Sequence, residues 1–382
     1  MFENATHLPQ RLQADDYTCP DIHQQELETC FLKGWQFLGD ASQLKNEGDF
    51  FTTELFGHPL ICWKQGGEPE TFLNVCSHRL CTITDKQTGN FEKRMRCQYH
   101  SWEFDKKGRT CKIPDAKSFR PLTRKMVLLK KYPTQQIGQL IFVSFEPDPP
   151  SLETFLGPEM HASLQEWFSN DYQPTANFDE VIECNWKVIQ ENILETYHIE
   201  TMHANTLKHC SPDKDSFHKF RENGNEFRMD YTNWGADRKM EWLISKWFDV
   251  EPRYDWRHMV RYPNLVIANS SLVTYVQSVV PTGPTTTNNI FRVFNYRGKA
   301  RTLRNRMAAA ALKIGAKRFV KKVLDEDSVV YPHIQKGVSA ADRPGDGLIS
   351  VREERIFDFQ EYLLRQLGRT EEPEESTIAI AK

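Results

Sequence analysis

Two short cysteine–histidine pairs constrain this chain of 382 residues more than any other feature of its sequence. The first pair is Cys76-x-His78, and the second is Cys97-x-x-His100. Two thiolates and two imidazoles suit either a tetrahedral zinc ion or a two-iron two-sulfur cluster in which two histidines replace two cysteines on one iron. Zinc fingers usually have one pair of cysteines and one pair of histidines, whereas each pair in this chain contains one cysteine and one histidine. The pattern therefore favours the iron–sulfur cluster.

A second pair of histidines, His198 and His203, lies in the segment QENILETYHIETMH. Glu195 precedes His198 by three positions, and on a helix these two side chains would share a face. His198 and His203 are five positions apart, so on an ideal helix they would not share a face. The helix must therefore loosen or end between them if both histidines hold one metal. Two imidazoles and a carboxylate from elsewhere form the facial arrangement of non-haem iron(II) oxygenases. The alternative is a surface helix with two unrelated histidines.

Length and composition bear on the number of domains, the kind of partner and the cellular compartment. The length predicts two domains, and a net charge of -3 gives no case for a nucleic-acid partner. The nine cysteines are odd in number and scattered, which fits a reducing compartment better than a disulfide framework. The N-terminal segment MFENATHLPQ has no signal-peptide pattern, and no apolar run approaches the roughly 20 residues that span a bilayer. We therefore expect a cytoplasmic protein.

Four regions follow from the local patterns. Residues 1–35 predict an irregular lead and a helix that begins at Pro20. Residues 36–150 contain short β-rich segments separated by turn residues, which predicts an all-β domain with the cysteine–histidine pairs on hairpin tips. A proline run ends this domain, and residues 151–368 predict a domain of helices and strands. Residues 369–382 form an acidic tail that we expect to be disordered.

Three segments in the second domain bear on a pocket. YPNLVIAN, SLVTYVQSVVP and NNIFRVFNYR predict antiparallel strands that form a pocket floor, the last two joined by a loop that holds Pro281, Gly283 and Pro284. Residues 226–260 are rich in aromatic rings, which would either cage a quaternary ammonium or serve ordinary packing. The rings are Phe227, Tyr231, Trp234, Trp242, Trp247, Phe248, Tyr254 and Trp256.

Residues 301–323 predict a basic helix, either a solvated face or a docking surface for an acidic electron donor. The segment LDEDSVVYPHIQKG follows it and offers three carboxylates for a metal, Asp325, Glu326 and Asp327. His209 is an alternative imidazole ligand.

Over about residues 30–340 the chain resembles the α-subunit of a Rieske non-haem iron oxygenase. The motifs that carry the resemblance are NVCSHR, CQYHSW, NWKVIQEN, LETYHIETMH and EDSVVYPHIQKG. Glu195 stands where aspartate is commoner, which is similar to the choline, carnitine and betaine monooxygenase branch. The resemblance implies an α+β fold, with an N-terminal all-β Rieske domain followed by an antiparallel-sheet helix-grip catalytic domain.

The resemblance also implies roles for residues at the first metal centre. Cys76, His78, Cys97 and His100 would hold a 2Fe-2S Rieske cluster. Arg79 and Trp102 flank the cluster and would either shield it and tune its potential or simply pack. Two positions where the family usually has glycine carry Leu80 and Ser101 instead. Both loops must therefore accept a side chain.

For the second centre, the resemblance implies mononuclear Fe(II) on His198, His203 and a carboxylate. The family's Glu-Asp is followed eight residues later by Gln, which fits Glu326-Asp327 and Gln335. Asp327 is therefore the expected third ligand, with Glu326 as second choice.

Two further residues receive expected roles at this centre. Glu195 would bridge His198 of one subunit to His100 of its neighbour in a ring of three subunits. Asn192 would order water or oxygen near the iron, or would only pack.

A separate partner should supply the electrons, because the chain has no G-x-G-x-x-G motif for a nicotinamide or flavin of its own. The expected function is O2-dependent hydroxylation or oxidative dealkylation of a small organic substrate, with electrons from NAD(P)H through a reductase or ferredoxin. A quaternary amine is one candidate substrate, and an aromatic or natural-product substrate is another. Two rivals are a Rieske electron carrier without catalysis and a zinc-stapled binding protein.

Overall fold

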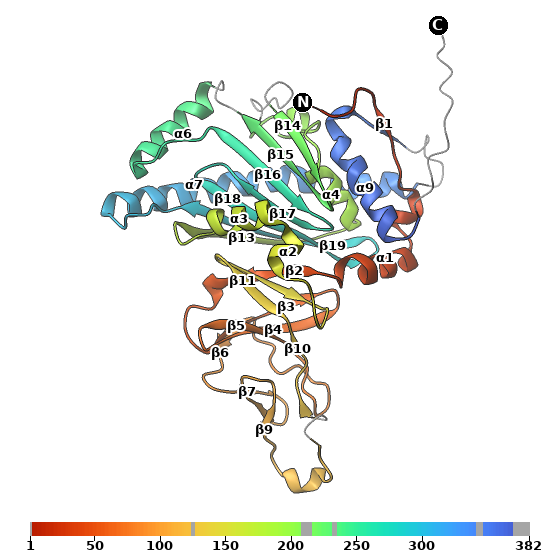
Figure 1. Ribbon diagram of the computed structural model, residues 1–382, viewed down its shortest axis with the longest axis vertical. Coiled ribbons are helices and arrows are strands. Elements are labelled where there is room, and N and C mark those ends of the chain that lie inside the picture. The colour runs from red at the N-terminus through yellow and green to blue at the C-terminus, as the bar shows by residue number, and fades with distance from the viewer. Residues whose placement is uncertain (1, 124–126, 208–215, 231–234, 341–346, 370–382) are drawn as a thin grey trace.

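A computed structural model describes residues 2–123, 127–207, 216–230, 235–340 and 347–369 (Figure 1). The chain folds into a β-rich module, in the lower half of the figure, and a larger body of helices around a seven-stranded sheet. This order confirms the predicted α+β class with an all-β N-terminal part. Within the described ranges, no helix combines the length and apolar character needed to cross a bilayer. The cytoplasmic location stays a prediction.

The N-terminal lead ends in the predicted helix. α1 covers Pro20–Glu26 and begins at Pro20, where the missing N–H of proline costs nothing in the first turn. One π-helical turn, Leu27–Phe31, continues it. β2 (Trp35–Asp40) then pairs with β12 (Leu140–Ser144), so the first and last strands of the module lie side by side.

Two further sheets build the module. The five-stranded sheet has the order β10-β5-β4-β3-β6, and the three-stranded sheet beyond it has the order β7-β8-β9. The loops after β5 and β7 carry the cysteine–histidine pairs, as expected for hairpin tips. The bounds are β3 Asp49–Leu55, β4 His58–Gln65, β5 Glu68–Leu73, β6 Thr88–Asn90, β7 Met95–Arg96, β8 Glu103–Phe104, β9 Thr110–Lys112, β10 Lys131–Tyr132 and β11 Thr134–Ile137.

The body contains a seven-stranded antiparallel sheet in the order β13-β19-β18-β17-β16-β15-β14. The three predicted strands occupy β17, β18 and β19, but Pro281 and Gly283 lie inside β18 and not in the loop. A register shift between these two residues absorbs the missing N–H of proline as a bulge. The bounds are β13 Tyr172–Ile182, β14 Ser216–Arg221, β15 Gly224–Asp230, β16 Asp255–Arg261, β17 Leu265–Asn269, β18 Val273–Gly283 and β19 Thr286–Tyr296.

Helices carry the remaining site segments. α7 (Leu303–Ser328) packs on β13 and β19 and continues past residue 323, where the predicted basic helix stopped. No proline occurs between the start of α7 and Pro332, so all three candidate carboxylates lie on this one helix. The other helices are α2 Leu152–Leu156, α3 Pro158–Trp167, α4 Trp186–Ile193, α5 Ile199–Met202, α6 Gly235–Phe248, α8 Tyr331–Val338 and α9 Glu354–Gln366.

The module and the body share one hydrophobic core. Phe37 and Phe142 of the module belong to the same buried cluster as Leu164 and Ile267 of the body. A shared core holds the two parts in a fixed relation, because separating them would expose apolar surface. The boundary expected near residue 150 remains a prediction.

Candidate metal centres

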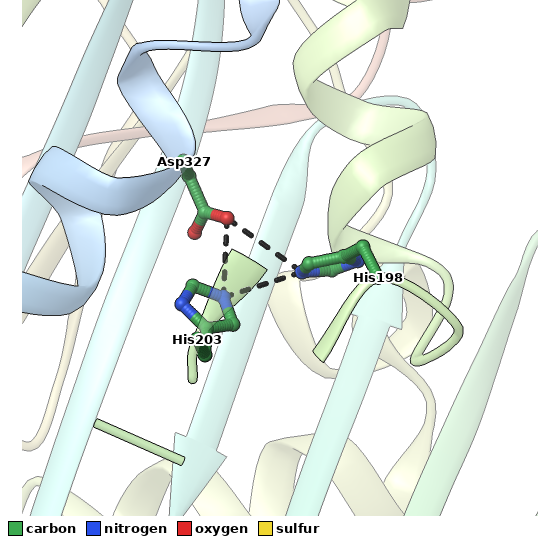
Figure 2. A group of neighbouring side chains, drawn as sticks. All are labelled: His198, His203 and Asp327. Atoms are coloured by element: carbon green, nitrogen blue, oxygen red, sulfur yellow. Dashed lines mark hydrogen bonds and ion pairs between the residues drawn. The ribbon is translucent and has the colours of Figure 1, made fainter. Parts of the chain in front are cut away.

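Three side chains from two distant segments converge in the body (Figure 2). One ligand atom each of His198, His203 and Asp327 lies within 4.8 Å of the others. The two Nε2 atoms are 3.3 Å apart, and Oδ1 of Asp327 lies 3.1 Å from Nε2 of His203 and 3.6 Å from Nε2 of His198. Metal–ligand bonds of about 2.1 Å hold neighbouring ligand atoms about 3 Å apart. The spacing fits one ion bound by two imidazoles and a carboxylate.

A break in the helix makes this convergence possible. α4 ends at Ile193 and α5 begins at Ile199, so the prediction that Glu195 and His198 share a helix face is wrong. Oε2 of Glu195 instead accepts hydrogen bonds from the backbone amides of Tyr197 and His198, the latter at 3.1 Å. This side-chain-to-backbone turn competes with the helix and brings the carboxylate to the His198 ring.

Two outer carboxylates fix the imidazoles. Glu195 pairs through Oε1 with Nδ1 of His198, and Oε2 of Glu326 lies 2.9 Å from Nδ1 of His203. Each carboxylate favours a proton on Nδ1 and leaves the Nε2 lone pair for a metal. The expected order of Asp327 before Glu326 agrees with this geometry, in which Asp327 faces both Nε2 atoms. The ligand assignment itself remains a prediction.

The third candidate carboxylate, Asp325, pairs with Lys321 on the exposed side of α7. It therefore takes no part in the group formed by His198, His203 and Asp327.

The charge around His203 suits a cation. Burial lowers the pKa of His203, but the hydrogen bonds and charges of Asp327 and Glu326 outweigh burial and raise this pKa above its usual value. Three carboxylates thus surround two imidazoles, and a divalent ion would balance their charge.

A cavity of about 490 Å³ opens on the three candidate ligands. Most of its wall is apolar, and the wall includes Ile193, Phe227, Ile244, Leu272, Phe291 and Val323. Cavities of this size and character typically bind small organic molecules.

The aromatic run of residues 226–260 divides between three environments. Phe227 and Trp256 line the cavity, whereas Phe248 lies in the hydrophobic core. Trp242 and Trp247 are 42% and 47% exposed. Tyr231 and Trp234 lie outside the described residues. The described rings of the run therefore do not gather into a cage, and Tyr254 is not among the residues that line the cavity.

Asn192 and Gln335 stabilise the site in different ways. Asn192 lines the cavity, and its Oδ1 accepts a hydrogen bond of 3.0 Å from the Tyr331 hydroxyl. Gln335 accepts a hydrogen bond of 2.7 Å from the backbone amide of Asn185, the N-cap of α4. Gln335 thus helps to hold α4 in position. His209 lies outside the described residues.

The second candidate centre lies on the two hairpin tips of the module. The side chains of Cys76 and Cys97 are buried, and the ring centroids of His78 and His100 are 4.7 Å apart. Burial, with Cys97 adjacent, raises the pKa of the Cys76 thiol to about 11, so iron would have to displace its proton. Nδ1 of His100 is buried without a hydrogen-bond partner among the described residues. This donor set fits an iron–sulfur cluster.

The flanking residues close over these ligands. Trp102 stacks on His78, with ring centroids 4.8 Å apart and planes inclined by 1°. Arg79 is exposed, with its guanidinium 5.9 Å from the Tyr99 ring centroid. The shielding expected of the flanking residues is thus available from Trp102.

The two positions where glycine is usual have left-handed backbones, with φ of 57° at Leu80 and 60° at Ser101. Leu80 lies two positions after His78, and Ser101 directly follows His100. Both hairpin tips turn there, because the backbone amide of Leu80 donates to the Cys76 carbonyl and that of Ser101 to the Cys97 carbonyl. Only glycine adopts this conformation without steric cost, which explains its usual presence there.

Sequence reasoning missed two charged residues of the cavity, Glu241 and Arg355. Arg355 lies on the buried face of α9 with Phe359 and Tyr362, four and seven positions later. An arginine in register with such an apolar stripe was the available signal, because charged residues are rarely fully buried without a partner.

Comparison with known proteins agrees with both centres. Residues 34–133 match the Rieske (2Fe-2S) domain family, and residues 164–369 match the ring hydroxylating alpha subunit (catalytic domain) family. The chain is 33% identical over 204 residues, 48% of its length, to the chlorobenzene dioxygenase subunit alpha of Cupriavidus sp. (strain PS12). It is 26% identical over 302 residues, 67% of its length, to the toluate 1,2-dioxygenase subunit alpha of Pseudomonas putida. The matched parts span 42% and 64% of those relatives.

A solved structure shares the fold. The quaternary ammonium Rieske monooxygenase CntA superposes with a TM-score of 0.78 at 18% identity, over 95% of each chain. The two matched domains indicate a Rieske cluster and a mononuclear iron. Because the catalytic match covers more than half of the chain and the Rieske match precedes it, the chain belongs to the family of Rieske-type ring-hydroxylating oxygenase alpha subunits.

Proposed function

We propose that this chain is the oxygenase component of a Rieske system that uses O2 and supplied electrons to hydroxylate or oxidatively dealkylate a small organic molecule. One observation carries the proposal. The group formed by His198, His203 and Asp327 opens on a cavity of about 490 Å³, in a chain that also bears the cysteine–histidine pairs. An electron carrier or a zinc-stapled protein would need neither that group nor the cavity.

The residues of the chain would divide the work as follows. Cys76, Cys97, His78 and His100 would hold the cluster, and His198, His203 and Asp327 the single iron. When bound, the cluster would supply electrons one at a time and the iron would supply oxygen activation.

Three other side chains would prepare the second centre for the metal and the substrate. Glu195 and Glu326 would keep the histidine Nε2 atoms unprotonated. The apolar wall would exclude water from the bound substrate. Asn192, fixed by Tyr331, would orient a water molecule or oxygen beside the substrate.

Electron supply is expected to cross between subunits. The strands that precede the cluster loops, β5 and β7, lie in the lower half of Figure 1, whereas α4 lies in the upper body. Leu80 and Tyr99 at the loop tips are 77% and 55% exposed, which supports contact with another protein. A homotrimer would bring one subunit's cluster beside the next subunit's iron, and a separate reductase or ferredoxin would feed NAD(P)H electrons.

Glu195 would serve as the bridge between subunits. Its oxygens already contact His198 and two backbone amides, and each carboxylate oxygen has two lone pairs. It therefore retains capacity to accept a hydrogen bond from His100 of a neighbouring subunit.

The substrate should have an apolar body, because apolar side chains form most of the cavity wall. The two sequence relatives are named for chlorobenzene and toluate, which supports an aromatic substrate. CntA is described as a quaternary ammonium monooxygenase, and a quaternary amine remains the other candidate.

Oxygen uptake by the purified holoprotein, with a reductase and NAD(P)H, tests the proposal. We expect uptake that depends on an added apolar substrate, together with iron and acid-labile sulfide in the protein. His198→Ala should lose the mononuclear iron and the uptake while it keeps the visible absorbance of the cluster. His333→Ala, at an exposed histidine on α8, is the matched control. Unchanged iron in His198→Ala, or zinc without sulfide in the wild type, would contradict the proposal.

A further inference from the structure

A buried arginine lines the same cavity as the candidate iron ligands. Arg355 is the second residue of α9 and is only 1% exposed. Burial of a charged side chain is costly unless the charge is paired or fully hydrogen-bonded. The groups around Arg355 therefore indicate whether the protein itself balances this charge.

The direct contacts of Arg355 are weak and uncharged. Its Nη1 lies 3.5 Å from Oδ1 of Asn225 and 3.5 Å from Nδ1 of His258, both at the outer limit of hydrogen bonding. Nε is buried and has no hydrogen-bond partner in the described part of the chain. Burial and the nearby Arg355 charge lower the pKa of His258 well below its usual value, so this ring is neutral.

The two acids whose charges act on Arg355, Glu195 and Glu354, are committed to other partners. Glu354 accepts hydrogen bonds from the backbone amides of Glu3 and Asn4, at 3.0 and 2.9 Å, and lies 2.7 Å from Nδ1 of His218. Glu195 is held by His198. Among the described residues, Arg355 forms no ion pair within 4.0 Å. Burial lowers the pKa of Arg355 to about 10, against the opposing charges around it, so it stays protonated near neutral pH.

The sheet holds the guanidinium against the cavity floor. Phe227 pairs with His258 in neighbouring strands, and His258 and Tyr275 both pair with Ala268, so these side chains form one row on one face. The guanidinium carbon of Arg355 lies 5.0 Å from the Phe227 ring centroid. The positive charge of Arg355 thus lies against the apolar floor of the cavity.

We propose that Arg355 binds a carboxylate group of the substrate, so that the substrate of this site is a small organic acid with an apolar body. The proposal rests on the proposed function and names its substrate class. A guanidinium and a carboxylate form two parallel hydrogen bonds. The Nε–H of Arg355, which has no partner among the described residues, would donate one of them, and Nη2 on the same edge would donate the other. The substrate carboxylate would neutralise the positive charge of Arg355. The apolar walls of the cavity would hold the rest of the substrate beside His198 and Asp327.

Calorimetric binding to the oxidised holoprotein, without reductant, tests this assignment separately from turnover. The probes are benzoate, benzamide and phenyltrimethylammonium, which share one ring and differ in charge. We expect benzoate to bind about 10- to 100-fold more tightly than benzamide, the usual gain from one charge-assisted pair. Phenyltrimethylammonium should bind more weakly than either, because Arg355 repels it.

Variants identify the residue responsible. Arg355→Gln should weaken benzoate binding to the level of benzamide, and Arg355→Lys should restore part of the difference. Arg365→Gln, an exposed arginine on the same helix, is the matched control and should leave all three affinities unchanged. Asn225→Asp keeps Arg355 and supplies an internal anion beside Nη1. It should therefore remove the preference for benzoate even if Arg355→Gln does not fold.

The outcomes separate this inference from the proposed function. Equal binding of benzoate and benzamide by the wild type, tightest binding of the ammonium probe, or a benzoate preference that survives in Arg355→Gln would overturn the role of Arg355. Selective benzoate binding without oxygen uptake for any acid would support the binding site and contradict the oxygenase function.

Discussion

Glu326 and Asp327 are neighbours on α7, yet they contact opposite nitrogens of one imidazole. Oε2 of Glu326 lies 2.9 Å from Nδ1 of His203, and Oδ1 of Asp327 lies 3.1 Å from Nε2 of the same ring. Asp327 therefore faces the candidate metal position that it shares with His198 and His203, and Glu326 orients the His203 ring through the opposite nitrogen. This arrangement separates the two candidate ligands, which the sequence presents as equivalent acids on one helix.

Removal of these two carboxylates should have unequal effects on iron. Asp327→Ala should lose the mononuclear iron, because it removes a donor oxygen from the group of three. Glu326→Gln should retain iron but bind it about 10- to 100-fold more weakly, as is typical for loss of an outer-shell partner. Iron content and competition with a chelator measure both effects. Asp325→Asn, which alters an exposed acid on the same helix, serves as control, and equal iron loss in the Glu326 and Asp327 variants would reverse the assignment.

Glu195→Gln should keep both metal centres and still slow turnover. The amide preserves the shape of the side chain but removes the negative charge that holds the His198 tautomer and that we expect to connect two subunits. Loss of such a partner typically lowers activity at least about 10-fold. Stopped-flow absorbance of cluster oxidation in a single turnover measures the electron-transfer step, and an unchanged rate would rule out the bridge.

Leu80→Gly should stabilise the module. Leu80 has φ of 57° and is 77% exposed, so glycine relieves backbone strain and loses almost no packing. A left-handed conformation costs a non-glycine residue about 1 kcal/mol, and the greater chain entropy of unfolded glycine offsets part of the gain. We expect about 0.5 kcal/mol in urea unfolding followed by cluster absorbance. Leu80→Ala keeps the backbone strain and should leave the free energy of unfolding unchanged. If Leu80→Ala were as stable as Leu80→Gly, the effect would come from loss of the leucine side chain and not from the backbone.

Glu191 should make stability depend on pH. It is half-buried on α4 and accepts hydrogen bonds from Tyr17 and Gln360, and burial of its carboxyl group raises its pKa from 4.5 to about 7. Between these values the folded state holds a proton that the unfolded state has released, so stability falls as pH rises from about 4.5 to about 7. Glu191→Gln keeps both hydrogen bonds and cannot ionise.

We therefore expect Glu191→Gln to be more stable than the wild type at pH 8, by on the order of 2 kcal/mol, and to have a flatter pH profile. Urea unfolding between pH 5 and 8 measures both quantities. Glu153→Gln, at an exposed acid on α2, is the control. Parallel pH profiles for the wild type and Glu191→Gln would contradict the raised pKa.

Much of the fold was predictable because its patterns are local. The proline at the start of α1 and the alternation in β17, β18 and β19 each depend on a few neighbouring residues, and both predictions are confirmed. The family relation depends on short motifs such as Cys76-x-His78, which the domain matches bear out. The end of α4 was less predictable, since the turn at Glu195 depends on one side chain that accepts two backbone bonds.

The sequence by itself determined the donor types available at both centres and the three neighbouring strands β17, β18 and β19. Only the tertiary structure decided which acid of α7 faces the histidines and that Arg355, some 150 residues after His198, lines their cavity. The physical reason is that local patterns report periodicity and turn chemistry, whereas the approach of distant charges depends on how α7 and α9 pack on the sheet.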